Sequence, residues 1–444
     1  MKAYGIVIAI KNTFQKSDKE GGNMKKLVYV LLYVFLVTVF ILTNGGVSYA
    51  AENPIVIGAP LATAFLYGWD AERGIKLAVE EINAQGGVKV GDKKRPFKVE
   101  VIDTRDLEPG VPVSEALLAV EKLILEKKAD FIVGGPVRSE AALAAMDLLS
   151  KYKKISIVTT GTLTPLYNKR VLDNYDKYKY CFRNSNSSLN MMNEFITLLE
   201  SMKKTYGFNK AYIMVQDVEH ARKGGEFMKK GLTDKGWQII DMKIYPTGNT
   251  DYSLGLTEAK NKGAQILFIW MDMPESAVLL KQWSDMKVKA IPLGFVCAAE
   301  QPGFWKATGG KGEYLIVNVC NGGNAPAKIT LWTMKFVEAY KKRWGLEPEG
   351  YGTSSSYMAV YQLKEAIEKA GTLEPDKVIK ALETLDLMGV YGRMRFDKSH
   401  QIIPSFDPKE GAVTCIFQWQ AGKRVQIFPP KVAEGKIMLP PWMK

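Results

Sequence analysis

Residues 52–87 read ENPIVIGAPLATAFLYGWDAERGIKLAVEEINAQGG, and this stretch decides the fold class. The apolar, β-branched run at Ile55–Gly58 predicts a short strand. Apolar residues then recur at helical spacing between positions 75 and 82, which predicts an amphipathic helix that ends at Gly86-Gly87. Asp70 is placed where it could cap the start of that helix. A strand that feeds a helix through an exposed loop is the unit from which open α/β proteins build ligand sites.

An export signal precedes this unit. Residues 27–42 are almost unbroken apolar, follow two lysines, and lead to small residues that end at Ala50. This run is shorter than the ~20 residues that span a bilayer. A signal peptide that starts at Met24 and is cleaved after Ala50 is therefore predicted in preference to a membrane anchor. Because no cysteine follows the apolar run before Cys181, a lipid anchor is not expected, and the mature protein is predicted to be free in a periplasm.

The composition narrows the function classes. The length beyond residue 50 predicts two domains of roughly 150–200 residues each. The net charge is +13, but basic and acidic residues alternate without a basic run interleaved with aromatics, so a solvated surface is favoured over nucleic-acid binding. The four cysteines form no CxxC pair and the chain has two histidines, so a zinc site is not expected. A Cys297–Cys320 disulfide and free buried thiols are both open alternatives.

Strands and helices alternate along the remaining chain. Strands are expected at 98–103, 131–134, 155–159, 211–216, 238–245, 266–270, 291–296 and 314–319, with amphipathic helices between them and a hairpin at 412–428. This order predicts parallel sheets with helices on both faces. The pattern restarts near residue 180, and three late helices between 329 and 385 could complete the first part. Two lobes are therefore predicted, 51–180 with about 321–395, and 181–320 with about 396–444.

Several segments, in this order, resemble the periplasmic branched-chain amino-acid-binding proteins of ABC transporters. The segments are VIGAPL, FIVGGPVRSEAALAA, ISIVTTGTLTP, AYIMVQD, DYSLGLTEAKNKGAQILFIWMDMPESAVLLKQW, IPLGF and YGRMRFDKSHQ. The resemblance implies a type I periplasmic-binding fold, in which two Rossmann-like α/β lobes joined by three hinge crossings close over a small molecule. It further implies a monomeric, cofactor-free binding protein that delivers an amino acid or a carboxylate to the membrane permease of an ABC transporter.

The resemblance also implies ligand contacts in the first lobe. In that family, a tyrosine follows the first strand, and backbone amides and hydroxyls follow two later strands. The matching positions are Tyr67, Arg138, Ser139, Gly161, Thr162 and Leu163. Amides at a helix N-terminus favour an anion, and Arg138, which stands where a serine is usual, could pair with a carboxylate.

The second lobe departs from the family pattern. The family often has a tyrosine where this chain has His220, and it places an acid for the ligand ammonium just after the segment PLG, where this chain has Phe295-Val296-Cys297. Asp217 and Asp272 each follow a predicted strand and could take over this role, and Val296 is a further expected contact. Otherwise the ligand has no ammonium, because a buried ammonium without a carboxylate is costly. The hypothesis at this point is a small carboxylate, aromatic or branched, held by Arg138.

Other interpretations stay open. An enzyme is not expected, because the sequence contains no GxSxG elbow, P-loop or HExxH motif. A ligand-sensing receptor module is an alternative, since the same fold serves that role. Arg138 could be a surface ion-pair partner, Asp217 and Asp272 could be helix caps, and Tyr67 could only cover the lobe surface. Tyr351, ahead of a predicted helix, could also reach the cleft.

Overall fold

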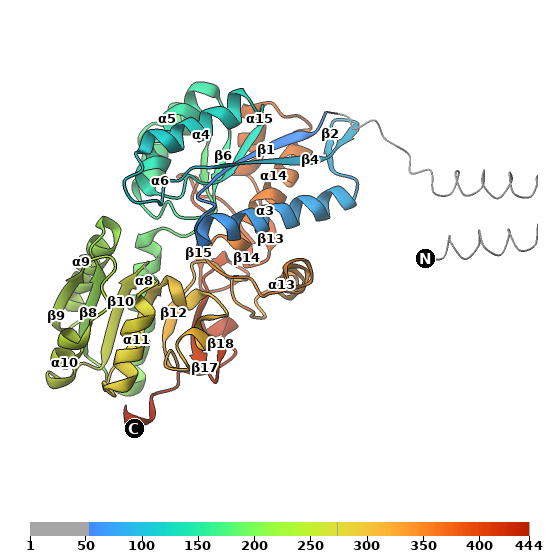
Figure 1. The fold of residues 1–444 in the computed structure, drawn as a ribbon. Coiled ribbons are helices and arrows are strands. Elements are labelled where there is room, and N and C mark those ends of the chain that lie inside the picture. Colours follow the sequence, from blue (N-terminus) through green and yellow to red (C-terminus); the bar gives the residue numbers. More distant parts are fainter. Residues whose placement is uncertain (1–52, 273, 444) are drawn as a thin grey trace, which may run out of the picture. The chain divides into compact units, whose positions relative to one another are not determined.

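Two sheets organise the computed structural model, which describes residues 53–272 and 274–443 (Figure 1). The predicted signal peptide, its cleavage after Ala50 and the start at Met24 lie outside the described residues. The mixed α/β architecture with parallel sheets confirms the predicted fold class. We call the first sheet with its helices lobe 1, and the second sheet with its helices lobe 2.

Lobe 1 is built on a five-stranded parallel sheet with the order β4-β1-β5-β6-β7. Its strands are β1 (Ile55–Leu61), β4 (Phe97–Asp103), β5 (Phe131–Gly134), β6 (Ser156–Val158) and β7 (Cys181–Arg183). Its helices are α3 (Leu66–Ala84), α4 (Val113–Leu125), α5 (Ser139–Tyr152), α6 (Leu166–Asp173), α7 (Tyr175–Tyr178), α13 (Leu331–Trp344), α14 (Thr353–Ala370) and α15 (Pro375–Glu383). The late helix α14 packs on α3, so residues nearly 300 positions apart share one hydrophobic core.

Lobe 2 is built on a seven-stranded sheet with the order β18-β17-β12-β11-β10-β8-β9. Its strands are β8 (Lys210–Gln216), β9 (Gln238–Tyr245), β10 (Ile266–Met271), β11 (Ile291–Val296), β12 (Ile316–Asn318), β17 (Ile416–Gln420) and β18 (Lys423–Phe428). Its helices are α8 (Ser188–Tyr206), α9 (Glu219–Asp234), α10 (Ser253–Asn261), α11 (Ser276–Asp285) and α12 (Phe304–Ala307). The strands β8 to β12 are parallel, and the predicted hairpin with its turn at Ala421-Gly422 adds two antiparallel strands at the edge.

The chain passes between the lobes at three places. We call these passages the crossings. The first crossing, residues 184–187, joins β7 to α8, and the second, residues 319–330, joins β12 to α13. The third, Thr414-Cys415, joins β16 (Ala412–Val413) to β17. Strand β16 belongs to a small sheet with β13 (Leu387–Gly389), β14 (Gly392–Met394) and β15 (Pro404–Ser405), and that sheet was not predicted. The lobe boundaries given above stay predictions.

The prediction that Asp70 caps α3 is wrong. The helix begins earlier, at Leu66, behind the N-cap residue Phe65, so Asp70 lies inside it and is fully buried. Its Oδ2 accepts hydrogen bonds from the backbone N–H of Gly352 at 3.1 Å and from the Thr353 hydroxyl at 3.4 Å. Asp70 thus holds the start of α14 against α3. The predicted end of the helix at Gly86-Gly87 is confirmed, since both residues have positive φ and donate back to the last turn.

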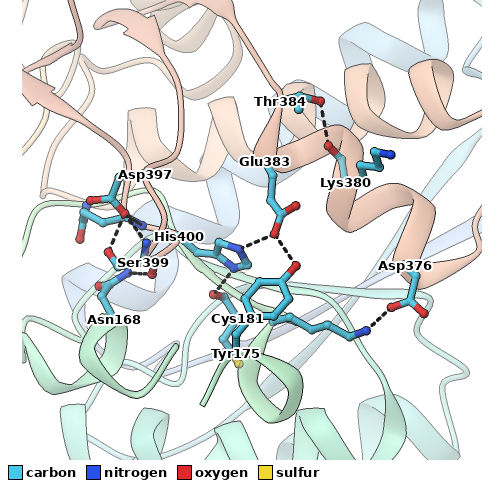
Figure 2. Close-up of polar contacts among 12 residues, drawn as sticks. Asn168, Tyr175, Cys181, Asp376, Lys380, Glu383, Thr384, Asp397, Ser399 and His400 are labelled. Carbon is cyan, nitrogen blue, oxygen red and sulfur yellow. Dashed lines mark hydrogen bonds and ion pairs between the residues drawn. The ribbon is translucent and has the colours of Figure 1, made fainter. Parts of the chain in front are cut away.

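Ahead of the third crossing, the segment around His400 packs against β7 of lobe 1. The His400 ring is fully buried and stacks on Phe182, with ring centroids 3.9 Å apart. Its Nε2 lies 3.0 Å from a carboxylate oxygen of Glu383, which also accepts from the Tyr175 hydroxyl at 2.6 Å (Figure 2). Its Nδ1 lies 3.3 Å from the Cys181 carbonyl oxygen (Figure 2). These contacts fix the segment beside the strand that leads into the first crossing.

The four cysteines are buried free thiols, so of the two alternatives left open by the sequence, the structure has the thiols and not a Cys297–Cys320 disulfide.

Candidate functional site

The candidate site lies where strand ends of the two lobes meet. Tyr67, Val137 and Leu163 follow the strands β1, β5 and β6 of lobe 1, and they share one hydrophobic cluster with Phe295 and Cys297 at the end of β11 in lobe 2. The carboxyl ends of parallel strands are where open α/β proteins bind ligands. Tyr67 and Leu163, two of the predicted contacts, are therefore brought together with residues of the opposite lobe.

Aromatic side chains line this junction. The Tyr67 ring packs on Tyr351 with centroids 4.4 Å apart, and Tyr351 lies 5.8 Å from Phe295. Phe295 in turn packs on Trp270 at 5.2 Å, and the Tyr67 hydroxyl contacts the sulfur of Cys297. A continuous aromatic wall therefore runs from one lobe into the other. Tyr351 is part of it because Asp70 holds the loop that precedes α14.

The loops after β5 and β6 are locked to each other. The N–H of Thr162 donates to the Val137 carbonyl at 2.7 Å, and its hydroxyl donates to the Pro136 carbonyl at 2.9 Å. Gly161 between them has φ +59°, and a Cβ there would lie 2.1 Å from the Val137 oxygen. Only glycine permits this approach. Gly161 and Thr162 therefore hold the two loops in contact with each other.

Arg138 and Ser139 are placed at the start of α5. The guanidinium of Arg138 has both Nη atoms 3.4 Å from the Val111 carbonyl oxygen, and its Nε lies 3.9 Å from the Glu140 carboxylate. The structure thus directs this side chain toward the loop before α4. The hydroxyl of Ser139 accepts from the Thr164 N–H at 3.3 Å. Their roles as ligand contacts stay predictions.

The predicted acids of lobe 2 have different surroundings. Asp272 follows β10, and its carboxylate lies 2.7 Å from Nε2 of His220 and 3.5 Å from the sulfur of Cys297. Burial lowers the pKa of His220, but the carboxylates of Asp272 and Glu140 outweigh it, so the pKa is raised above its ordinary value. Because Glu140 belongs to lobe 1, this group lies where the lobes meet. Asp272 is therefore close to the aromatic wall.

Asp217 and Val296 lie apart from the aromatic wall. Asp217 is exposed and paired with Arg222 in the same loop and helix of lobe 2. Val296 is fully buried in a separate core cluster of lobe 2, whereas Phe295 and Cys297 on either side of it belong to the junction cluster. Neighbouring side chains of a strand point to opposite faces, so Val296 faces away from the junction.

The structure reveals an acid that the sequence did not single out. Glu300 ends the short 3₁₀ helix η1 (Cys297–Glu300) behind β11 and is fully buried. Among the described residues, both of its carboxyl oxygens and the Oδ1 of Asp70 have no hydrogen-bond partner. Burial raises the pKa of Glu300 well above its usual range, and the charges of Asp70 and Asp272 raise it further, against a smaller lowering by Arg424. Glu300 thus lies within electrostatic reach of two further carboxyl groups, those of Asp70 and Asp272.

One local signal could have pointed to Glu300, and none to the burial of Asp70. The family pattern places the acid directly after the segment PLG, whereas Glu300 follows one helical turn past the end of β11. An acid placed between two alanines and a Gln-Pro pair, with few polar neighbours, is a candidate for burial. Asp70 is buried by α14, which is distant in the sequence, so its local sequence shows no sign of burial and suggests a helix cap instead.

Comparison with known proteins now decides the family. The profile of the periplasmic binding protein family matches residues 61–407. The chain belongs to this family. Members are binding proteins and not an enzyme class, as expected from the sequence.

Relatives and solved structures agree with this assignment. The chain is 24% identical to Leu/Ile/Val-binding protein homolog 8 of Brucella abortus (strain 2308) over 414 residues, covering 90% of this chain and 94% of the relative. Among solved structures, a putative branched-chain amino acid ABC transporter protein from Silicibacter pomeroyi has a TM-score of 0.78 at 20% identity, with 88% and 100% coverage. The benzoate complex of a solute-binding protein from R. palustris has a TM-score of 0.66 at 15% identity, with 88% and 99% coverage. At these identities, the structural likeness shows the fold alone.

Two kinds of feature are absent from the described chain, residues 53–272 and 274–443. It contains no helix with the length and apolar character needed to cross a membrane. Within the same residues, no three His, Cys, Asp or Glu side chains are grouped so that they could hold a metal ion.

Proposed function

We propose that this periplasmic binding protein is the solute-binding component of an ABC transporter, and that it captures a small amino acid between its lobes and delivers it to a permease. The family and the names of the relatives support a transport role in the periplasm. A branched-chain amino acid binding protein from Streptococcus pneumoniae in complex with isoleucine has the same fold, with a TM-score of 0.68 at 19% identity, over 87% of this chain and 100% of that chain.

The inference that the ligand bears an ammonium group rests on the carboxyl of Glu300, which has no hydrogen-bond partner among the described residues. A buried carboxylate without a partner is unfavourable, and the raised pKa of Glu300 expresses this cost. An ammonium group supplies a positive charge and three N–H donors. Asp70 and Asp272 add negative charge to the same surroundings. We therefore infer that Glu300 takes the role of the acid that the sequence analysis found missing, and that the ligand need not be a simple carboxylate.

The fold suggests how capture proceeds. A ligand enters when the lobes are apart and binds first to the loops after β1, β5 and β6. Rotation about the three crossings then brings Phe295 and Cys297 against Tyr67. Closure is stabilised only by interactions that the open form lacks, so the contact of Tyr67 with Cys297 is a marker of the closed arrangement.

Calorimetric titration tests the proposal. The mature protein is titrated with leucine, with its amine-free analogue 4-methylpentanoate and with its carboxyl-free analogue isoamylamine, and a wider amino-acid panel follows. We expect an amino acid to bind, and Glu300→Gln to weaken it at least tenfold, since the loss of a charge-assisted contact exceeds about 1.4 kcal/mol. Glu226→Gln, an exposed acid of α9, is the matched control and leaves affinity unchanged.

Two outcomes would contradict it. Tightest binding of the amine-free acid, with no effect of Glu300→Gln, would favour a carboxylate ligand, as in the benzoate complex of the R. palustris protein. A flat response of melting temperature to a broad panel of metabolites would argue against solute binding altogether.

A further inference from the structure

All three crossings meet at one buried side chain, Glu194 of α8. The Nδ2 of Asn186, in the first crossing, donates to its Oε1 at 3.0 Å. The Nδ2 of Asn318, the last residue before the second crossing, donates to its Oε2 at 3.0 Å. The hydroxyl of Thr414, in the third crossing, donates to Oε1 as well. Glu194 itself is 4% exposed, so water does not compete for these contacts.

The crossings are also bonded to each other around Glu194. The Nδ2 of Asn186 lies 3.0 Å from the Thr414 hydroxyl and 3.2 Å from the Cys320 carbonyl oxygen. The Oδ1 of Asn318 accepts from the Cys320 N–H at 2.7 Å. Asn186 therefore links the first crossing to the other two, and the Glu194 carboxyl joins the second to the third.

We propose that Glu194 is a positioning residue that holds the three crossings in the closed arrangement, and that its ionisation opposes closure. The proposal rests on the proposed function only where it concerns ligand affinity. Any rotation of the lobes has to move these crossings relative to one another. The bonds at Glu194 must then stretch or break, so the group that holds them together acts on the equilibrium between open and closed forms.

The chemistry of the carboxyl group explains the direction. The protonated group keeps acceptors for both asparagine amides and can donate its own proton to the Thr414 hydroxyl, so the network survives protonation. Ionisation leaves a negative charge in a buried site, and within the described part of the chain no ion pair to Glu194 is present. Burial raises the pKa of Glu194 to about 7, although the hydrogen bonds from Thr414, Asn318 and Asn186 lower it.

The surroundings of Glu194 contain little other charge. The titratable group that faces it is the thiol of Cys320, whose own pKa burial raises well above its usual range. The other contacting side chains from the crossings are uncharged, as are the residues one turn away on α8. When the crossings separate, water reaches the carboxyl and its pKa falls toward the ordinary value. Closure thus binds a proton. It is most favoured below the ordinary pKa of a glutamate, weakens as pH rises from there to about 7, and changes no further above that value.

Distance measurements on the ligand-free protein test this directly. Spin labels are attached to cysteines introduced at Leu172 in lobe 1 and Leu254 in lobe 2, both exposed, while the native thiols are buried. In the otherwise unchanged chain, we expect the closed population to fall between pH 5.5 and pH 8.5. In Glu194→Gln, which is uncharged throughout, this pH response is lost. Glu200→Gln, on the same helix but bonded to Trp237 and not to a crossing, retains it.

Ligand affinity gives the second readout. With a bound amino acid, affinity is expected to fall by up to about tenfold per pH unit as pH rises from the ordinary pKa of a glutamate to about 7, and to level off above that value. This slope is absent in Glu194→Gln. Thr414→Val removes one donor without removing the carboxyl, and it is expected to broaden the distance distribution while keeping the pH response. The same pH response in Glu194→Gln as in the unchanged chain, or none in either, would overturn the proposal. A protein that responds to pH but binds no solute would leave this role of Glu194 standing and refute the proposed function.

Discussion

The two histidines of the chain lie beside carboxylates in different regions, and their pKa values shift in opposite directions. His220 lies where the lobes meet, with 38% of its side chain exposed, and the carboxylates of Asp272 and Glu140 raise its pKa. His400 lies inside lobe 1 with 1% exposed, and burial lowers its pKa despite the carboxylate of Glu383 (Figure 2). The same pair of residue types therefore favours the protonated ring at the junction and disfavours it in the core.

The contrast indicates that His220 contributes to lobe closure and that His400 contributes to the stability of the fold. A half-exposed ring with two acidic neighbours can gain its charge at low cost, and one of those neighbours belongs to the other lobe. A fully buried ring stacked on Phe182 contributes packing and fixed hydrogen bonds instead. We expect substitutions at His400 to change the free energy of unfolding, and substitutions at His220 to change lobe closure.

The largest effect is expected for His400→Ala. It removes a fully buried ring, its stack on Phe182 and its contact with Glu383, so the free energy of unfolding should fall by about 3 kcal/mol. His220→Ala, the matched substitution at the junction, should cost under about 1 kcal/mol because its ion pair is partly exposed. Urea unfolding followed by circular dichroism measures both. Equal losses would remove the distinction drawn between the two regions.

Local sequence patterns predicted most of the fold. The strands at 131–134 and 291–296 were predicted at the residues where β5 and β11 occur, because each is a short, almost wholly apolar run, as is typical of buried parallel strands. The small sheet was missed, since β15 and β16 have two residues each and so carry no period. Such strands form only because neighbouring segments, among them the one that holds His400, bring them together.

The candidate site was predictable only in part. Tyr67 and Asp272 follow strand ends, and this local feature places both near the junction. The burial of Asp70 depends on Gly352, 282 positions away, and the network at Glu194 joins residues up to 228 positions apart. Contacts at such separations leave no trace in a single sequence. Whether the predicted residues touch the ligand stays a prediction.

An intermediate effect is expected from pH on stability. The pKa of His400 is lowered in the folded protein, so the unfolded chain binds the proton first. Its contribution is complete above about pH 6.5, the ordinary pKa of histidine, and is lost as pH falls below that value. One such proton changes the free energy of unfolding by at most about 1.4 kcal/mol per pH unit.

The variant His400→Asn isolates this contribution. Asparagine tolerates the positive φ of 58° at this position, and it does not titrate. The difference in unfolding free energy between the unchanged chain and His400→Asn should shrink as pH falls from 7 to 5. A difference that stays constant over this range would mean that His400 does not bind a proton on unfolding.

The smallest effect is expected at the junction, from His220→Asn. The raised pKa of His220 means that its charged contact with Asp272 and Glu140 is complete below about pH 6.5 and is lost as pH rises through the folded pKa. His220→Asn should therefore weaken ligand affinity a few-fold at pH 6 and leave it unchanged at pH 9, because a partly exposed ion pair contributes little. Titration at the two pH values checks this. Protonation of Glu194 also favours closure, so the double variant with Glu194→Gln is needed to separate the contributions of His220 and Glu194. If the two groups act independently, the double variant loses both pH-dependent parts, and its change in affinity at each pH equals the product of the two single-variant factors.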